Sequence, residues 1–175
     1  MEEIELRSQM EVNFMGTALL TRACLPLLRA SRGTVLNISS AFGLTGFPLH
    51  SAYCASKFAL EGFSESLYYE VREHGVRVGL IEPGAHRTGF TANVVWSEGH
   101  SDTYATATGG YKRLSQRVIS RPQAAGPEQV ARTVVRLAEA RSIPLRTPVG
   151  RDALLTRLSL RLVPDTLRVR ILGSV

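Results

Sequence analysis

Two short apolar segments rich in β-branched residues, 34–38 and 76–81, constrain the fold more than any other feature of this sequence. Each is too short for a typical helix, so each is expected to be a buried strand. The segment 51–74 between them is long enough for a crossover helix, with Ser51 predicted to cap its start and Gly75 to end it. A strand, a helix and a strand in this order predict two parallel neighbours joined by a right-handed crossover.

The rest of the chain extends this alternation. Residues 3–30 have helical periodicity over their whole length, and Pro26 should kink or terminate that helix. A helix starting at Pro127 precedes a short segment, 145–149, whose proline predicts an edge strand. Residues 151–171 give one or two basic amphipathic helices. We therefore expect an α/β fold, a partial Rossmann-type doubly wound parallel sheet of about three strands with flanking helices.

Some finer features also carry expectations. Gly62 lies inside the predicted helix 51–74, where glycine weakens a helix, so it indicates close packing against another backbone. The ordinary interpretation of the C-terminal basic helices is a solvated face whose leucines, Leu154, Leu155, Leu158 and Leu162, pack against the domain. Residues 91–126 are the least patterned part, and a loop of this length is usually a functional lid or disordered. We treat 1–175 as one domain, with 91–126 as a substrate lid and 151–175 as basic helices.

Composition and charge exclude several classes of protein. No apolar run approaches the length of a membrane span, and the first residues lack the basic and apolar pattern of a secretory signal. Cys24 and Cys54 cannot form a disulfide framework and indicate a reducing, cytoplasmic compartment, while four scattered histidines give no metal site. The net charge of +6 is concentrated after residue 100, with 13 Lys and Arg against 5 Asp and Glu. Without interleaved aromatics this predicts an arginine-rich soluble surface rather than a nucleic-acid partner; lipid association through 151–171 is the minor alternative.

The chemistry is concentrated in two neighbouring segments. Tyr53 and Lys57 are four residues apart on a predicted helix and so share a face. An ammonium beside a phenol favours the phenolate and lowers the tyrosine pKa, which makes the tyrosine a usable general acid and base. Ser40 follows a buried strand at the carboxyl edge, where parallel sheets place their ligands, and a hydroxyl there can donate to a developing oxyanion.

These residues stand in a longer pattern. Asn-Ile-Ser-Ser at 37–40 is followed by Tyr-Cys-Ala-Ser-Lys-Phe-Ala-Leu-Glu-Gly at 53–62, and then by Gly-Val-Arg-Val at 75–78 and Glu-Pro-Gly at 82–84. With Val-Asn-Phe-Met-Gly-Thr at 12–17, this order and spacing resembles the short-chain dehydrogenase/reductase family from about residue 8 to residue 150. The segment 53–62 is most similar to the steroid and retinol dehydrogenase branch.

The resemblance implies roles for individual residues. Tyr53 would be the catalytic acid and base, and Lys57 would lower its pKa and hold the nicotinamide ribose. Ser40 would orient the substrate oxygen, with Ser39 as the competing assignment. Asn13 would stabilise a water that relays protons to Lys57, and its alternative is a polar residue that only kinks the helix.

A second set of residues would meet the cofactor, which is NAD or NADP. By resemblance, Pro83, Gly84, the backbone of His86 and Thr88 lie against the nicotinamide carboxamide, and the alternative for Pro83-Gly84 is a purely structural turn. The implied substrate is a small alcohol or ketone of apolar character, since the loop after Ser40 holds Phe42, Leu44, Phe47 and Leu49. Core packing would explain those four side chains equally well.

The sequence departs from the family at its start. It contains no Gly-rich turn to cradle a pyrophosphate and no residue to select NAD or NADP, so it looks like the C-terminal half: a fragment, a mis-started frame, a splice form or a relic. The strand 34–38 should then be an exposed edge, and the chain alone should be unstable or aggregate. Two functions remain open: an oxidoreductase, which in full-length form would be a homo-oligomer through helices 3–30 and 51–74, and a non-catalytic module that binds partners through the same helices.

Overall fold

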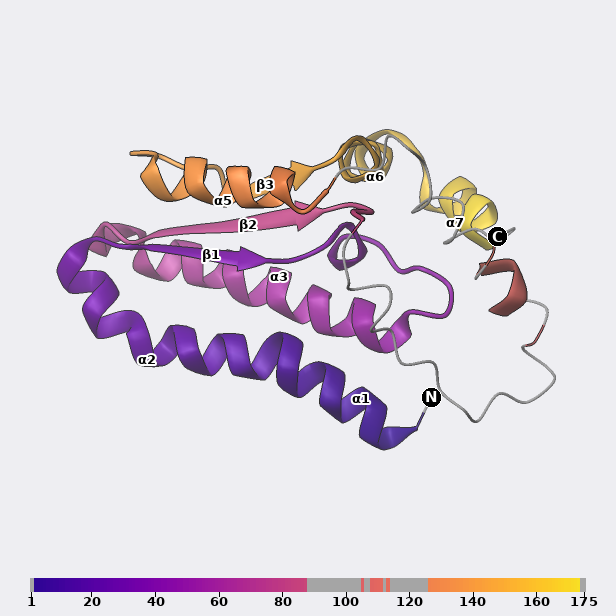
Figure 1. Ribbon diagram of the computed structural model, residues 1–175, viewed down its shortest axis with the longest axis horizontal. Helices are drawn as coiled ribbons and strands as arrows, with labels where there is room; N and C mark the ends of the chain where they lie inside the picture. Colours follow the sequence, from indigo (N-terminus) through magenta and orange to yellow (C-terminus); the bar gives the residue numbers. More distant parts are fainter. Residues whose placement is uncertain (1, 88–104, 106–107, 112, 114–125, 174–175) are drawn as a thin grey trace.

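A three-stranded parallel sheet forms the centre of the molecule (Figure 1). The computed structural model describes residues 2–87, 105, 108–111, 113 and 126–173. Within them the strands are β1 (Thr34–Ile38), β2 (Arg77–Pro83) and β3 (Arg146–Val149), in the order β1-β2-β3. The expected α/β parallel sheet is confirmed. Because β2 is central, β1 and β3 are the two edges of the described sheet, as predicted.

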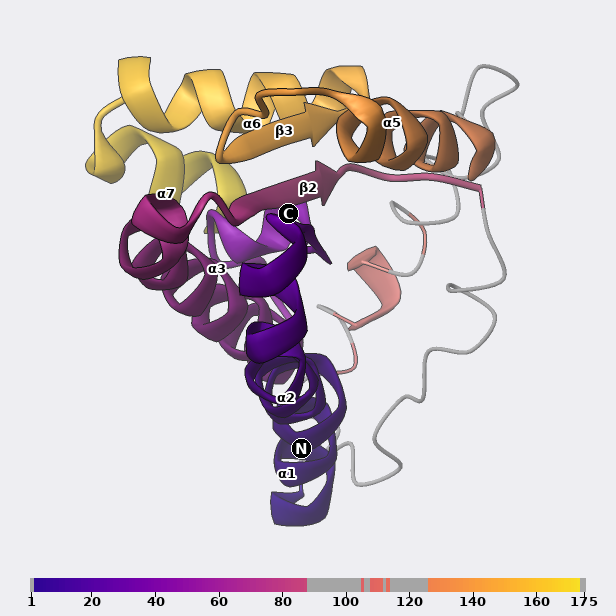
Figure 2. The same cartoon turned by 90° about the vertical axis from the view of Figure 1, so that its left-hand side faces the viewer.

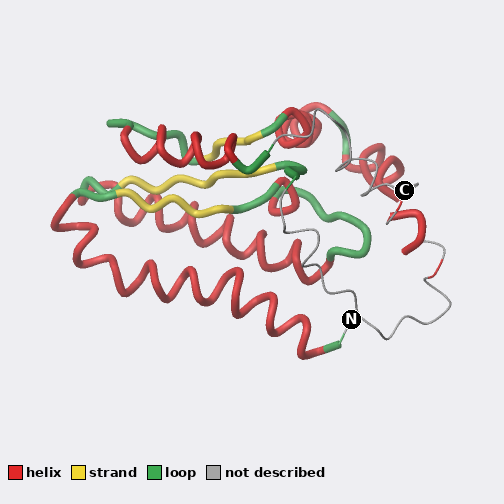
Figure 3. Tube along the Cα trace, in the orientation of Figure 1, coloured by secondary structure: helices red, strands yellow, loops and turns green. Residues whose placement is uncertain are grey.

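Helices cover both faces of this sheet (Figures 1 and 2). The helices α1 (Glu3–Met10), α2 (Gly16–Ser31) and α3 (Ser51–Val71) lie on one face, and α5 (Glu128–Glu139) lies on the other. Each parallel pair is joined through a helix, β1 to β2 through α3 and β2 to β3 through α5. Both strand pairs are parallel, so the strands run in one direction (Figure 1), and Figure 3 shows them in yellow between the helices.

The long N-terminal helix differs from the prediction in where its regularity breaks. Pro26 does not end the helix, because α2 continues to Ser31. Pro26 is exposed, so water can reach the backbone carbonyl that receives no hydrogen bond from the proline. The irregularity lies earlier, where Glu11–Met15 form a π-helical turn between α1 and α2. Such turns insert an extra residue into the helix and are often found at functional sites. This one contains Asn13.

Helix α3 confirms the predicted crossover and corrects two details. Gly75 ends the helical segment with a φ of 76°, after a 3-10 turn at Arg72–His74. Ser51 is already the first helical residue, and His50 occupies the N-cap without a side-chain hydrogen bond. Gly62 does not pack closely, because a Cβ placed there would find no atom within 4 Å in the described chain.

Two apolar clusters hold the layers together. One joins β1, β2 and α3 around five buried side chains, Val35, Leu67, Val71, Val76 and Val78. The other joins β2, β3 and α5 around Ile81, Leu137 and Val149. Apolar side chains therefore fill the space between the sheet and α3 on one face and between the sheet and α5 on the other, as expected for a sheet covered on both sides.

The outer faces of several helices are apolar. Along α1–α2, side chains at helical spacing face outward, with Val12 70%, Leu19 49% and Leu27 73% exposed. The C-terminal helices α6 (Arg151–Leu162) and α7 (Asp165–Gly173) break at Pro164 as predicted, but the expectation that four leucines pack against the domain is wrong. Leu154, Leu155, Leu158 and Leu162 lie on the exposed side of α6, and Ala153 is the buried residue. Among the described helices none is long and apolar enough to cross a membrane.

Candidate active site

The candidate site lies at the edge where β1 and β2 end, beside the first turns of α3 (Figure 1). Parallel strands place their carboxyl ends together, so residues that follow β1 meet residues that follow β2. The main chain fixes this meeting directly, since the amide of Ser39 donates to the carbonyl of Ile81 over 2.8 Å. Ser40, two residues after β1, begins a single 3-10 turn, Ala41–Gly43, that packs against α3.

Ser40 and Tyr53 are brought together as the spacing predicted. The Ser40 hydroxyl accepts a bond from the amide of Phe42 at 3.2 Å, which leaves its own proton to donate to the Tyr53 oxygen. The pKa of Tyr53 differs from expectation. Burial raises it above its usual value and outweighs the bond from Ser40, which lowers it. The expected lowering of the tyrosine pKa by Lys57 is therefore not what this structure shows.

Lys57 explains the difference by where its ammonium points. Its Nζ donates to the carbonyl of Ile38 at 2.9 Å and lies over the Tyr53 ring, 5.7 Å from the ring centroid. Burial lowers the pKa of Lys57, and the carboxylate of Glu61, one helical turn further along α3, opposes that shift. The lysine thus stands beside the tyrosine, as predicted, with one of its three N–H groups bound to the strand.

Asn13 reaches α3 from the π-helical turn. Its Nδ2 donates to Gln9 at 2.8 Å and to the hydroxyl of the fully buried Ser56 at 3.1 Å. Ser56 in turn donates to the carbonyl of Tyr53 at 2.8 Å. The structure therefore connects Asn13 to the backbone of Tyr53 through Ser56, a contact that the sequence pattern did not identify.

The segment after β2 supplies the third side of the site. The amide of Gly84 donates to the carbonyl of Val149 at 2.9 Å, which holds Pro83 and Gly84 against β3, and the Ala85 amide donates to the Asp152 carboxylate. Gly84 has no room for a side chain, because a Cβ there would overlap the carboxylate of Asp152. Thr88 lies outside the described residues, as does most of the expected lid 91–126.

His86 shows a feature suited to a ligand. Its Nδ1 lies 3.0 Å from the carbonyl of Gly84, and its Nε2 is buried with no hydrogen-bond partner among the described residues. A buried imidazole nitrogen normally has a partner, so this atom is available to a polar group placed against the end of β2. Together with the free N–H groups of Lys57, it gives a cofactor amide or ribose suitable partners at this edge.

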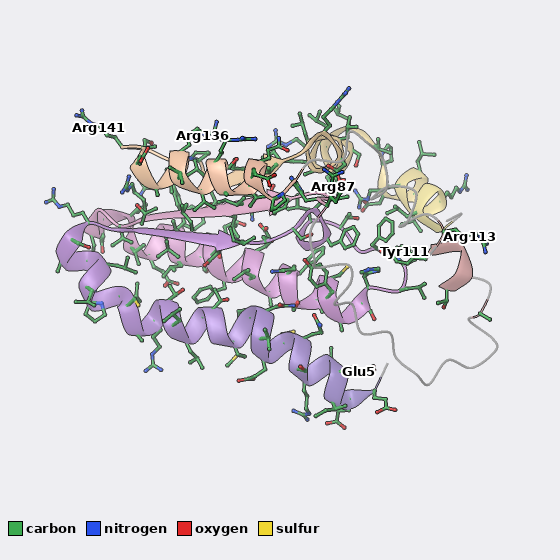
Figure 4. All side chains as sticks on the ribbon, viewed as in Figure 1. Glu5, Arg87, Tyr111, Arg113, Arg136 and Arg141 are labelled. Carbon is green, nitrogen blue, oxygen red and sulfur yellow. The ribbon has the colours of Figure 1, made fainter. Side chains whose placement is uncertain are left out.

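Aromatic rings line the approach to Tyr53. Phe42 stacks on Phe47 with centroids 4.8 Å apart and meets the Tyr53 ring edge-on at 6.2 Å. His50 and Tyr111 close the group, with their rings 4.7 Å apart and the tyrosine oxygen 3.0 Å from His50 Nε2. Figure 4 shows Tyr111 at the end of the molecule where the strands terminate. The loop composition predicted Phe42 and Phe47 but not His50 or Tyr111, because a partner 61 residues away gives no local signal.

A buried ionic cluster lies behind these rings and was also missed. Glu82, the residue before Pro83, is 0% exposed and lies 3.5 Å from Arg146 and 3.6 Å from Arg157. Arg146 also binds Glu61 at 2.9 Å and Glu65 at 2.8 Å, both on α3. Burial and the neighbouring Glu61 raise the pKa of Glu82 to about 7, against the lowering effect of the two guanidinium groups. The signal in the sequence was a charged residue within the apolar strand 77–83.

Known proteins match both the sequence and this fold. Residues 1–98 match the family model described as short chain dehydrogenase. The chain belongs to the short-chain dehydrogenase family. A 3-ketodihydrosphingosine reductase from Bacteroides thetaiotaomicron is 38% identical over 153 residues, which is 85% of this chain and 55% of the reductase. The predicted family is thus confirmed, while the likeness to the steroid and retinol branch stays a prediction.

Solved structures of short-chain dehydrogenases agree with the fold. A short-chain dehydrogenase from Streptomyces avermitilis has a TM-score of 0.78 at 34% identity, covering 98% of this chain and 60% of that one. A short-chain dehydrogenase from Burkholderia cenocepacia, solved in complex with NADP, has a TM-score of 0.72 at 23% identity, covering 94% and 58%. The chain therefore spans little more than half the length of these relatives.

Proposed function

We propose that this chain contributes the catalytic half of an NAD(P)-dependent oxidoreductase that interconverts a hydroxyl and a carbonyl on an apolar substrate. The observation that carries the proposal is the hydrogen bond between the Ser40 hydroxyl and the Tyr53 oxygen, at the sheet edge where Lys57 also lies. A substrate oxygen placed beside Ser40 and Tyr53 would meet two hydroxyl groups that lie within hydrogen-bonding reach of each other. Membership of the short-chain dehydrogenase family supports the reaction class.

The proposed role of Tyr53 is to give a proton to the substrate oxygen during reduction and to remove it during oxidation. Its raised pKa keeps the phenol protonated near neutral pH, which suits the reductive direction. Ser40 orients the same oxygen through its hydroxyl. The proposed role of Lys57, whose ammonium lies over the tyrosine ring at 5.7 Å from its centroid, is to hold the cofactor beside Tyr53.

Nicotinamide supplies the hydride when it is bound. The residues that would hold it are Lys57 for the ribose and the segment of Pro83, Gly84 and His86 for the carboxamide, with Thr88 continuing that segment. The buried and unpartnered Nε2 of His86 supports this placement, and extends the expected role of His86 from its backbone to its ring. Asn13 acts on Tyr53 through Ser56, in addition to the water-relay role that the family resemblance implies.

The apolar substrate class is supported by the aromatic group of Phe42, Phe47, His50 and Tyr111 beside Tyr53. Rings of this kind form a flat, largely apolar surface, in which a hydrogen bond joins His50 and Tyr111. The B. thetaiotaomicron relative is named as a 3-ketodihydrosphingosine reductase, so the reduction of a keto group is consistent with that name. The proposal is a ketone or alcohol with an apolar body next to the reacting carbon.

The experiment is a turnover assay with reduced nicotinamide and a set of apolar ketones. It uses the chain alone and the chain joined behind the N-terminal half of a related dehydrogenase. Tyr53→Phe should lower turnover by about 100-fold or more, because it removes the transferable proton and keeps the ring. The matched control is Tyr69→Phe on the same helix, where the side chain is exposed and turnover should be unchanged. Near-normal turnover in Tyr53→Phe would reject the proposed acid and base.

The two serines give a second matched pair. Ser40→Ala should cost about 100-fold to 1,000-fold in turnover, the loss found when a transition-state donor is removed. Ser39→Ala should have little effect, since the buried Ser39 hydroxyl has no hydrogen-bond partner in the described ranges of the chain. The reverse result would assign the substrate contact to Ser39. Lys57→Arg should restore little of the activity lost in Lys57→Ala, because a planar guanidinium does not replace a compact ammonium.

A second candidate function is a non-catalytic, partner-binding module, and one observation favours it. The outer faces of α1–α2 and α3 expose apolar side chains, among them Val12, Leu27, Phe58 and Tyr69. Faces of this kind normally pack against another helix, so we propose that they pair with a second copy or with another part of a longer protein. Titration with reduced nicotinamide and sedimentation analysis separate the two functions, because a module that assembles without binding cofactor would support this candidate alone.

A further inference from the structure

The ionic cluster behind the candidate site joins four elements. Glu82 comes from β2, Arg146 from β3, Arg157 from α6, and Glu61 and Glu65 from α3. Glu61 and Glu82 approach the same atom, Nε of Arg146, at 2.9 Å and 3.5 Å. Glu61 is 5% exposed and Glu82 is 0% exposed, whereas Glu65 lies at the rim with 41% of its side chain exposed. The two inner carboxyl groups are therefore close together in a site with little water.

The inner carboxylates of this cluster are poorly hydrogen-bonded. Two guanidinium groups face Glu61 and Glu82, and the third carboxylate, Glu65, lies at the exposed rim. Within the part of the chain that the structure describes, neither oxygen of Glu82 has a hydrogen-bond partner, and one oxygen of Glu61 has none. An ionised carboxylate without hydrogen bonds is costly in the interior, and two neighbouring ones more so. A proton on Glu82 lowers both costs, because it leaves one ionised carboxylate in place of two.

The cluster also acts on Lys57, the residue proposed to assist catalysis. Glu61 follows Lys57 by one helical turn, and its carboxylate opposes the lowering of the Lys57 pKa by burial. The turn that begins at Ser40 lies directly on this part of α3, since a Cβ on Gly43 would meet Glu61 Cγ at 3.1 Å and Lys57 Cβ at 3.3 Å. A change of charge in this carboxyl pair therefore acts on Lys57 across a single helical turn of α3.

We propose that Glu61 and Glu82, which meet at Arg146, form a carboxyl pair in which Glu82 takes up a proton, and that the charge of this pair controls how strongly Lys57 holds its own proton. Glu82 is on this proposal a positioning residue that acts on Lys57 through Glu61. The catalytic meaning of the effect rests on the function proposed above for Lys57. The carboxyl pair itself does not.

The pair makes a prediction about folding as well as about Lys57. Because the pKa of Glu82 is raised to about 7, the native chain retains a proton that the unfolded chain releases at lower pH. The contribution of this group is therefore fully present below its ordinary pKa of 4.5 and is lost as pH rises to about 7. Glu82→Gln should remove that loss, so its melting temperature should fall less than that of the wild type between pH 5 and pH 8.

The decisive measurement is the titration of Lys57 by carbon-13 NMR of labelled lysine. Lys57 and Lys112 are the two lysines of the sequence, so Lys112→Arg leaves a single signal from the whole chain. In the range where a lysine titrates, Glu82 is ionised, and Glu82→Gln removes that negative charge. The pKa of Lys57 should then fall by roughly half a unit or more.

Glu65→Gln is the matched control. It also loses a contact to Arg146, but at the exposed rim, and it should leave the titration of Lys57 unchanged. If Glu82→Gln does not fold, Glu61→Gln replaces it, and it should lower the pKa of Lys57 and also that of Glu82. An unchanged Lys57 titration in a folded Glu82→Gln or Glu61→Gln chain overturns the proposal, and so does an equal shift in Glu65→Gln.

Neither readout requires turnover. A Lys57 titration that shifts as expected in a chain that reduces no carbonyl compound supports the carboxyl pair and counts against the proposed function. An active enzyme in which the Lys57 titration does not shift supports the proposed function and overturns the carboxyl pair. The two failures are therefore distinguishable.

Discussion

Gly43 is the position where one added methyl group should do most damage to the candidate site. A Cβ there would lie 2.7 Å from Ser39 Oγ, 3.1 Å from Glu61 Cγ and 3.3 Å from Lys57 Cβ. The Cβ atom of Lys57 is fixed by the helix backbone, and the Glu61 side chain is held by its ion pair with Arg146. Overpacking of this kind costs about 1–3 kcal/mol, or roughly 3–9 °C in melting temperature for a chain of this size. We expect Gly43→Ala to lose that stability and to move the Ser40 turn away from Lys57.

Gly46 provides the control within the same loop. A Cβ there finds nothing within 4 Å, and neither glycine has a positive φ, so the backbone accepts alanine at both positions. Thermal and urea denaturation should show Gly46→Ala at wild-type stability or slightly above it. Adding Ser39→Ala to Gly43→Ala should recover part of the loss, because it removes the oxygen at 2.7 Å. Equal melting temperatures for Gly43→Ala and the wild type would refute the close packing.

Three further predictions concern stability and binding. Gly62→Ala should raise the free energy of unfolding by about 0.5–1 kcal/mol, since a Cβ at position 62 points into open space on α3. A fall in melting temperature that depends on protein concentration would instead show that another molecule covers this face of α3. Leu80→Ala should lower the free energy of unfolding by about 2–5 kcal/mol in urea titrations, because the leucine is 0% exposed in the central strand, and a loss below about 1 kcal/mol would contradict its burial. Reduced nicotinamide should bind residues 1–175 far more weakly than a full-length relative, because the chain lacks a Gly-rich pyrophosphate turn; a dissociation constant of about micromolar, measured by fluorescence, would exclude this explanation.

Local patterns predicted the framework of this fold well. Thr34–Ile38 and the strand after Gly75 were found because a buried parallel strand needs a continuous apolar run, which is visible in a few residues. The helical i,i+4 spacing and the turn after β1 likewise place Tyr53, Lys57 and Ser40 together. These relations depend on residues close in sequence or on the rule that parallel strands end at one edge.

The errors arose where a contact spans the chain. The pKa of Tyr53 was expected to fall, but burial raises it and outweighs the bond from Ser40, and burial is not visible in the spacing of two residues. The exposed leucines of α6 were expected to pack because apolar periodicity says which residues share a face and not which way that face points. The pairing of Glu82 with Arg146 joins residues far apart in the chain, on two different strands, and single-sequence reasoning has no means to identify it.

Within the described residues, β1 is hydrogen-bonded to a neighbouring strand on one side only. Protein concentration should therefore determine which strand pairs with its open side. A strand on the same polypeptide would dock there at an effective concentration of about millimolar, set by the length of the connecting chain. A strand on a separate molecule must reach the same edge by diffusion. In dilute solution the edge of this chain therefore remains available to a complementing strand supplied in trans, while in concentrated solution copies compete for it by pairing with one another.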